Sequence, residues 1–425
     1  MQEKHTKMEF NAGDLVRLRL AKEEKEGIVI DNPDSELVIL KLDSGYNIGI
    51  KKEKILSGRV LRKYVEPKVK VSIKQKKNLP KIGLVITGGT IAAKLNPKKG
   101  GVSWLTDVNE FSRFYPEIFD VVSVKKIDVP FMTSSEAMTS EHWIKMAKSV
   151  KAMVDDPEIK GVIVTHGTDF LHYTSAALSF FLKNLGKPVI LTYSQRSIDR
   201  ASSDANLNLR CAAKLAISDI AEVMLVGHAS SNDDYCNAMR GTKVRKLHSS
   251  RRDAFKSVNC EPIAKVWPDK IEINNPYNKR SDKKCELDVN YSDKVALIKF
   301  YPGQDASILD FYALKYKGVV IEVGGLGHLP VSEAEHNWIP KLKKHIKNGF
   351  VVCGAAQTIN GRLDPYVYSN GRELIDAGVI FLEDMLAECA LVKLGFVLGH
   401  YGWKKEVRKK MLENFAGELN ERLVN

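Results

Sequence analysis

The sequence lacks the features that mark several large classes of protein. No apolar run is long enough to cross a bilayer, and no signal peptide is evident. Only six cysteines occur in 425 residues, and none of them forms a Cys-x-x-Cys pair. Disulfide frameworks and zinc sites need closer spacing than this. These absences predict a soluble, cytoplasmic protein with reduced thiols, no metal site and no membrane contact.

Three motifs that would indicate a nucleotide-binding or metal-binding site are also missing. There is no Gly-x-x-x-x-Gly-Lys-Ser/Thr phosphate loop, no Gly-x-Gly-x-x-Gly opening a helix, and no His-Glu-x-x-His. The sequence therefore predicts that this chain binds no cofactor. If ATP takes part in its reaction, another chain is expected to hold it.

What is present suits a chain of two or three domains, since 425 residues with 44% hydrophobic content can bury more than one core. The net charge of +13 is a weak indication of an acidic partner such as RNA. Eight Lys or Arg residues against one Glu lie between Arg62 and Lys81. Such a run is more often a solvated linker than a phosphate-binding surface.

The N-terminal part has closely spaced short strands with turn residues between them. This pattern predicts a small SH3-like β-barrel over residues 1–61, followed by a basic linker over 62–80. Aromatic and basic residues do not alternate here as in surfaces that bind single-stranded nucleic acid, which favours protein docking or scaffolding. The expected strands are 15–18, 27–30, 37–42 and 46–50.

Beyond the linker, strand and helix patterns alternate, which is typical of a parallel sheet covered on both faces. We expect one α/β domain over 81–275, a connecting segment over 276–292 and a second, smaller α/β domain over 293–425. Residues 133–136 look like the cap of a helix over 137–153, and the section 232–292 looks irregular. The expected strands are 82–86, 121–124, 161–164, 188–192, 221–226, 297–300, 318–322 and 350–353.

Two threonine loops follow neighbouring strands of this pattern. Thr90 stands in Gly-Gly-Thr-Ile-Ala, and Thr168 stands in His-Gly-Thr-Asp. Both loops should emerge at the carboxyl edge of the sheet, where open α/β folds place their ligands. A threonine hydroxyl there can act as a nucleophile, although glycines after a strand can also simply make a turn.

A basic stretch farther along the chain adds a lysine. Lys246 lies in Arg-Lys-Leu-His-Ser-Ser-Arg-Arg-Asp-Ala-Phe, and one lysine in such a stretch is usually a surface charge. If it stood between the hydroxyl of Thr168 and the carboxylate of Asp169, it could take the hydroxyl proton.

Four motifs in this order resemble the L-asparaginase/glutaminase family. They are 87–92, 164–169, the segment around Lys246, and 318–322 together with 325–328. The resemblance covers about residues 81–400 and implies an asparaginase-like two-domain α/β fold. The added N-terminal β-barrel, the segment 194–205 and the basic segment 240–253 resemble the branch that supplies the glutaminase (D-type) subunit of archaeal glutamyl-tRNA(Gln) amidotransferases.

At the positions where the motifs match, the resemblance implies that Thr90 is the nucleophile that attacks the side-chain amide of glutamine. It implies Thr168, Asp169 and Lys246 as the supporting triad. Ser135, Glu136 and Asp169 would bind the α-carboxylate and α-amine of the substrate. Ser135 and Glu136 could equally form a helix cap.

The resemblance also implies partners. Ammonia would pass to an E-type partner subunit, which would use ATP and Mg to convert Glu-tRNA(Gln) to Gln-tRNA(Gln). The charged tRNA would be held mainly by that partner, and two copies of this chain would pair within a heterotetramer. The rival interpretations are a free-standing L-asparaginase/glutaminase and a catalytically silent scaffold subunit.

One departure from the family pattern concerns the expected lid over 94–101. Family members usually carry a tyrosine there, whereas this sequence has Pro97 and no tyrosine between Thr90 and Val102. Three explanations stay open. Basal hydrolysis could be weak until the complex assembles, a partner or a later residue such as Tyr115 could accept the proton, or Lys246 and Thr168 could share that work.

Overall fold

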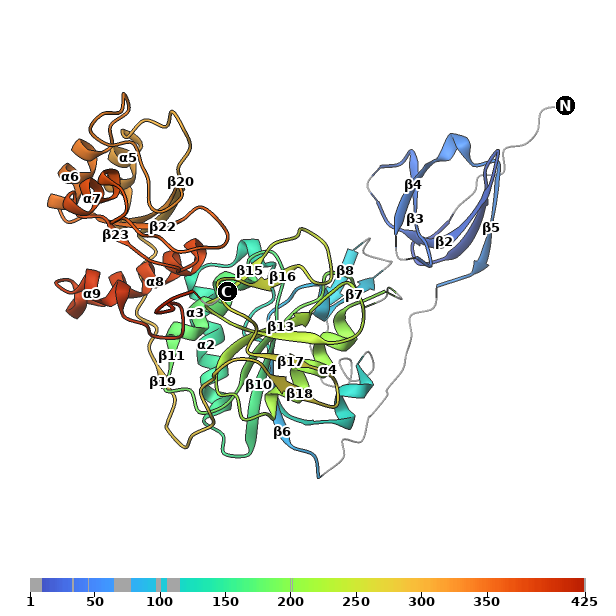
Figure 1. Cartoon of the computed structure of the whole chain (residues 1–425). Coiled ribbons are helices and arrows are strands. Elements are labelled where there is room, and N and C mark those ends of the chain that lie inside the picture. Colours follow the sequence, from blue (N-terminus) through green and yellow to red (C-terminus); the bar gives the residue numbers. More distant parts are fainter. Residues whose placement is uncertain are drawn as a thin grey trace.

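The computed structural model describes residues 10–32, 34–44, 46–64, 78–96, 101–104, 115–198, 200 and 202–423, with residues 92–96 and 101–104 described by their backbone alone. Figure 1 shows a small N-terminal β domain, a large central α/β body and a second α/β unit formed by the C-terminal part of the chain. No helix within these ranges is both long and apolar enough to span a bilayer.

The N-terminal domain is an antiparallel sheet of strand order β4-β3-β2-β1-β5 with its own apolar core. Alternating residues of its strands, such as Val16, Leu18, Val38 and Leu40, point into that core. The small β domain expected from the sequence is thus confirmed, with a fifth strand that lacks clear alternation. The strands are β1 (Leu15–Arg19), β2 (Glu24–Ile30), β3 (Leu37–Lys41), β4 (Asn47–Lys51) and β5 (Ser57–Arg62).

The central body is built on an eight-stranded sheet of order β18-β17-β14-β13-β12-β10-β6-β9. Five neighbouring strands are parallel, as the strand-helix alternation predicted. They are β9 (Ser123–Asp128), β6 (Lys81–Ile86), β10 (Ile159–Thr165), β12 (Val189–Thr192) and β13 (Val223–His228).

The expectation that residues 232–292 are irregular is wrong. Short strands in this section extend the sheet in the antiparallel sense, so the sheet is mixed, and two more form a separate hairpin. Runs of two to five residues rich in Lys, Arg and Glu carry too little apolar alternation to be recognised as strands. They are β14 (Cys236–Arg240), β15 (Val244–Lys246), β16 (Phe255–Ser257), β17 (Ala264–Val266) and β18 (Ile271–Ile273), and β19 (Glu286–Leu287) pairs with β11 (Leu182–Lys183).

Helices cover both faces of this sheet. Helices α2 (Ser140–Val154) and α3 (Leu171–Phe181) pack on one face, and α4 (Ala205–Ala216) packs on the other. The predicted helix start at 137 is wrong, because residues 135–137 form a short 3₁₀ turn. The helix is capped instead by Thr139, whose side chain and that of His142 satisfy each other's backbone amides.

The C-terminal unit has a fully parallel sheet of order β20-β21-β22-β23. Helix α8 (Ala387–Gly399) packs on this sheet and against α3, where the rings of Phe180 and Phe396 stack 5.9 Å apart, so one apolar core is shared by both units. The remaining elements are β20 (Val295–Lys299), α5 (Ile308–Lys315), β21 (Gly318–Val323), α6 (Ile339–Lys347), β22 (Val351–Ala356), α7 (Ser369–Asp376), β23 (Ile380–Phe381) and α9 (Val407–Leu412).

Candidate active site

Three adjacent parallel strands, β9, β6 and β10, end at the carboxyl edge of the large sheet. The loops that follow them begin side by side there. The strand ends are in register, with Val85 opposite Val164 and Ile86 opposite Thr165. The backbone amide of Thr87 donates to the carbonyl of Thr165 at 3.3 Å, and its hydroxyl donates to the same oxygen at 2.8 Å. The two threonine loops therefore leave the sheet side by side, as the sequence predicted.

Glycines let these loops touch. Gly89 has a φ of +82°, and a Cβ placed on it would lie 2.5 Å from both the Gly167 nitrogen and the His166 oxygen. Gly88 has a φ of +119° and is equally close to the carbonyl oxygen of Thr133. Only glycine suits both the backbone angle and the space at these positions. Thr90 and Thr168 each come one residue after the Gly89–Gly167 contact, so this contact holds the two loops together directly before both threonines.

Lys246 joins the second loop from the end of β15. Its ammonium donates to the hydroxyl of Thr168 at 2.9 Å and to the carboxylate of Asp169 at 2.7 Å. The Thr168 hydroxyl lies 3.3 Å from the same carboxylate oxygen. Three of the four predicted catalytic residues thus form one hydrogen-bonded group. The lysine side chain is largely buried, whereas Asp169 is 61% exposed at the site mouth.

The Lys246 ammonium sets the charge of this group. Its hydrogen bond and its positive charge lower the pKa of Asp169 below the ordinary aspartate value, against a smaller opposing effect of burial. Asp169 is therefore ionised at neutral pH. An exposed carboxylate held ionised can bind a cationic group of a ligand.

The predicted substrate-binding residues lie on the third loop. Ser135 is buried against Gly167, and its hydroxyl accepts a hydrogen bond of 3.3 Å from the backbone amide of Phe170. Glu136 is exposed on the same loop. Since Thr139 caps α2, neither residue is occupied as a helix cap. Glu136 is exposed to a ligand at the carboxyl edge, whereas Ser135 is buried against the second threonine loop.

The chain after Thr90 forms a β-hairpin where a lid was expected. β7 (Ala93–Asn96) pairs antiparallel with β8 (Gly101–Trp104). Pro97, which replaces the usual tyrosine, lies outside the described residues. Tyr115 is buried beneath the start of this hairpin, and its hydroxyl donates to the carbonyl of Ile91 at 2.8 Å.

Burial also raises the pKa of the Tyr115 phenol, with a smaller contribution from the charge of Asp204. The phenol therefore stays protonated and is a poor proton acceptor. This observation argues against Tyr115 as the replacement for the missing lid tyrosine.

Several residues around Lys246 carried no signal in the sequence. Arg245, its neighbour on β15, forms a 2.9 Å ion pair with Glu388 at the start of α8. This pair ties the C-terminal unit to the strand that positions the lysine. Burial lowers the pKa of the nearby His172 to about 3, with the charges of Arg245 and Lys246 acting in the same direction, so its imidazole is neutral.

A further carboxylate holds the next loop of the same edge. Asp204 is fully buried and accepts hydrogen bonds from the backbone amides of Gln195 and Arg196 and from the hydroxyl of Ser194. The guanidinium of Arg200 in this loop lies 5.4 Å from the ring centre of Tyr46 in the N-terminal domain. The side chain of Arg200 therefore lies against the β domain.

No three His, Cys, Asp or Glu side chains of the described residues gather as a group that could hold a metal ion. The side chains that hydrogen-bond to one another are those of Lys246, Thr168 and Asp169, and Ser135 and Glu136 lie on the neighbouring loop. This donor set suits nucleophilic attack on a carbonyl compound better than it suits metal ligation.

Models of known families match three parts of the chain. Residues 81–279 match the N-terminal domain of asparaginase, and residues 294–411 match the C-terminal domain of glutaminase/asparaginase. Residues 10–61 match the GatD N-terminal domain.

Curated relatives match over nearly the whole length. The D subunit of the glutamyl-tRNA(Gln) amidotransferase of Pyrococcus abyssi is 47% identical over 96% of this chain and 95% of its own. The D subunit of the Thermococcus kodakarensis amidotransferase is 46% identical over 96% of this chain and 94% of its own.

Solved structures agree in fold. The thermostable L-asparaginase from Thermococcus kodakarensis superimposes with a TM-score of 0.73 at 30% identity, covering 80% of this chain and 100% of that one. L-asparaginase I from Vibrio cholerae gives a TM-score of 0.68 at 28% identity, and the match covers 80% of this chain and 99% of that one.

Proposed function

Because the chain belongs to the asparaginase/glutaminase family, together with the amidotransferase D subunits, we propose that it is the glutaminase subunit of a tRNA-dependent amidotransferase. It hydrolyses glutamine and releases ammonia, which a partner subunit uses with ATP to convert Glu-tRNA(Gln) to Gln-tRNA(Gln). The observation that supports this most directly is the hydrogen-bonded group of Lys246, Thr168 and Asp169 beside the Thr90 loop.

In this proposal Thr90 is the nucleophile. Its hydroxyl oxygen attacks the side-chain carbonyl carbon of glutamine, and the hydroxyl proton passes by way of Thr168 and Lys246 to the amide nitrogen. The carbon–nitrogen bond then breaks and the nitrogen departs as ammonia. The product is a glutamyl ester on Thr90. A water polarised by Thr168 then cleaves the ester and restores the hydroxyl.

Ser135, Glu136 and Asp169 hold the amino-acid end of glutamine. The two exposed carboxylates suit the α-ammonium group, and Lys246 keeps one of them ionised. The Ser135 hydroxyl, which rests against the Gly167 loop, suits the α-carboxylate. These contacts orient the side-chain amide toward Thr90.

The proposal places ATP and Mg in an E-type partner subunit, in the cytoplasm, and assigns no cofactor to this chain. Charged tRNA is held mainly by that partner. Self-pairing into a heterotetramer is supported by exposed apolar side chains on the loops that follow β20 and β22 at the carboxyl edge of the second sheet. They are Tyr301, Ile359, Tyr366, Val367 and Tyr368.

A free-standing L-asparaginase/glutaminase is the alternative favoured by the asparaginase fold of the core. The discriminating experiment measures ammonia release from glutamine and from asparagine, with and without the partner subunit and charged tRNA. We expect glutamine turnover that rises when both are added. Rapid turnover of either free amide by the isolated chain, unchanged by partner and tRNA, would favour the alternative.

Variants test the assigned roles. Thr90→Ala, Thr168→Val and Lys246→Ala should each abolish glutamine-dependent transamidation, while transamidation with added ammonia continues. Thr358→Val, at an exposed threonine of the C-terminal unit, is the matched control. If the three variants kept full glutamine-driven activity, the assignment would be wrong, and the silent-scaffold interpretation would gain support.

A further inference from the structure

Helix α5 exposes apolar side chains on its outer face. Leu309 is fully buried on the inner side, whereas Leu314 is 79% exposed and Phe311 is 55% exposed. Phe311 and Leu314 are three residues apart, so they lie on the same face of the helix. A helix that is apolar on its inner and outer faces is normally covered on both. Its outer face is therefore suited to an interface.

A groove of about 820 Å³ adjoins this face, which we name the α5–α8 groove. It lies at the amino edge of the second sheet, beside the starts of β21 and β22. Leu314, Phe350, Val397 and Leu398 contribute its apolar surface. The groove thus continues the exposed face of α5 into a concave apolar site.

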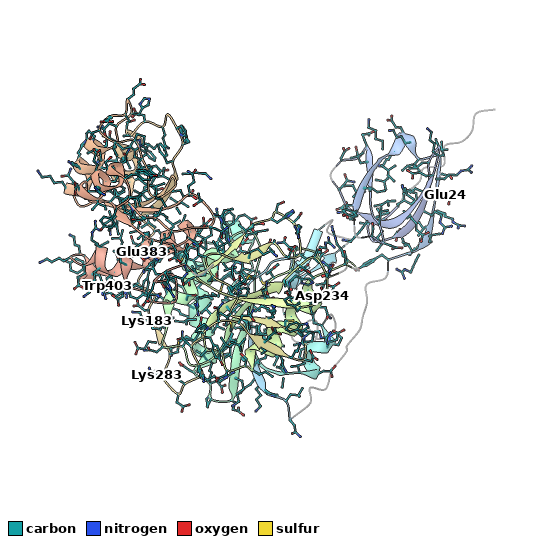
Figure 2. The ribbon with its side chains drawn as sticks, viewed as in Figure 1. Glu24, Lys183, Asp234, Lys283, Glu383 and Trp403 are labelled. Atoms are coloured by element: carbon teal, nitrogen blue, oxygen red, sulfur yellow. The ribbon has the colours of Figure 1, made fainter. Side chains whose placement is uncertain are left out.

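Tyr401 also lines the groove and is 91% exposed. Its position is set by Trp403 in the same short turn, whose ring stacks on His400 with centroids 3.7 Å apart. The Lys183 ammonium lies 5.5 Å from the Trp403 ring centre, and Figure 2 shows both side chains where the two α/β units meet. A tyrosine displayed on a rigid support is a typical anchor residue of protein interfaces.

The rim of the groove is positively charged. Lys317, Lys344 and Lys404 line it, and Asp310 is its single acidic lining residue. The Asp310 carboxylate already accepts hydrogen bonds from Lys341 at 2.5 Å and from His345 at 2.6 Å. Among the described residues, neither Lys317 nor Lys404 has an ion-pair partner. The rim can therefore pair with added carboxylates.

We propose that the α5–α8 groove docks the partner amidotransferase subunit through an apolar segment flanked by acidic residues. This inference rests on the proposed function, which requires such a subunit. A second copy of this chain fits less well, since a two-fold contact would set the same lysines against one another. RNA would pair with the lysines but would leave Phe311 and Leu314 uncovered.

The test measures binding of the full-length chain to the partner subunit. Leu314→Glu should weaken the affinity by 100-fold or more, because it places a carboxylate in the apolar centre and opposes the acidic flanks. Lys404→Glu should weaken it by about 10-fold, with most of that loss removed at high salt. Ile273→Glu on the edge strand β18, where the isoleucine is 46% exposed, is the matched control and should bind like the wild type.

Three results would overturn the inference. They are unchanged partner binding by Leu314→Glu, a changed oligomeric state of the isolated Leu314→Glu chain in analytical ultracentrifugation, and loss of tRNA binding with partner binding intact. Failure of the proposed function gives a different signature, in which the wild-type chain does not bind the partner at all. Thr90→Ala should bind the partner normally, which separates docking from catalysis.

Discussion

Lys243 and Asp384 form an ion pair that is completely removed from solvent and joins the two α/β units. The ammonium lies 2.5 Å from the carboxylate, and neither side chain has any exposed area. Asn420 completes the arrangement by donating its backbone and side-chain amides to the same carboxylate. Lys243 lies three residues before Lys246, so this junction also anchors the strand that carries the proposed catalytic lysine.

Lys243→Met should therefore destabilise the whole protein. The change leaves the Asp384 carboxylate buried without its counter-ion, which typically lowers the free energy of unfolding by about 3–5 kcal/mol. Urea denaturation followed by circular dichroism measures the loss. Lys409→Met removes an exposed pair with Glu406 and should change stability by at most about 1 kcal/mol. If the two variants lowered the free energy of unfolding equally, burial of the Lys243–Asp384 pair would not increase its contribution to stability.

Gly89→Ala should abolish glutamine hydrolysis, because a Cβ there would lie 2.5 Å from the His166 and Gly167 backbone and push the two threonine loops apart. Gly303 is a close control, since its φ of +85° matches the +82° of Gly89 but nothing lies within 4 Å of an added Cβ. Gly303→Ala should lose about 1 kcal/mol of stability from backbone strain alone and keep its activity. Ammonia release measures the activity of the two variants, and thermal unfolding measures their stability. An active Gly89→Ala enzyme would contradict the proposed loop contact.

The carboxyl-edge loops were predictable because local patterns determine them. Apolar strands followed by Gly-Gly-Thr and His-Gly-Thr-Asp place Thr90 and Thr168 at one edge of a parallel sheet, whichever family the chain belongs to. The start of α2 was missed because Ser135 and Glu136 look like a cap in sequence, whereas Thr139 and His142 form the cap in the structure.

Contacts between distant parts of the chain could not be predicted. The pairs Arg245–Glu388 and Lys243–Asp384 join residues more than 140 positions apart, and no periodicity in either segment indicates the partner. Their existence depends on how α8 and the second sheet pack against the first unit. A single sequence carries no local signal of that packing.

Acid should destabilise the protein through His166, a buried histidine at the start of the second threonine loop. Burial lowers its pKa from 6.5 to about 4. As the pH falls below 6.5, His166 becomes protonated in the unfolded chain. In the native protein it stays neutral until about pH 4. Stability is therefore lost between these values, by about 3 kcal/mol for this residue.

Urea denaturation at a series of pH values checks this expectation, and His166→Gln should flatten the decline between pH 6.5 and 4. His172 acts in the same direction, so part of the slope should remain in that variant. NMR titration of the imidazole resonances gives an independent measurement. A native His166 that titrates near 6.5 would refute the explanation.

Tyr115→Phe separates a supporting role of Tyr115 from a catalytic one. The variant keeps the buried ring but loses the hydroxyl that donates to the Ile91 carbonyl beside Thr90. If the hydroxyl only steadies the turn, kcat for glutamine should fall by about 10-fold or less and the pH profile should keep its shape. Loss of a general base typically costs about 10²–10⁴-fold and removes one limb of the profile. Because burial keeps the phenol protonated, we expect the smaller effect, and steady-state ammonia release from pH 5 to 9 measures it. A large loss with an altered profile would instead make Tyr115 the proton acceptor in place of the missing lid tyrosine.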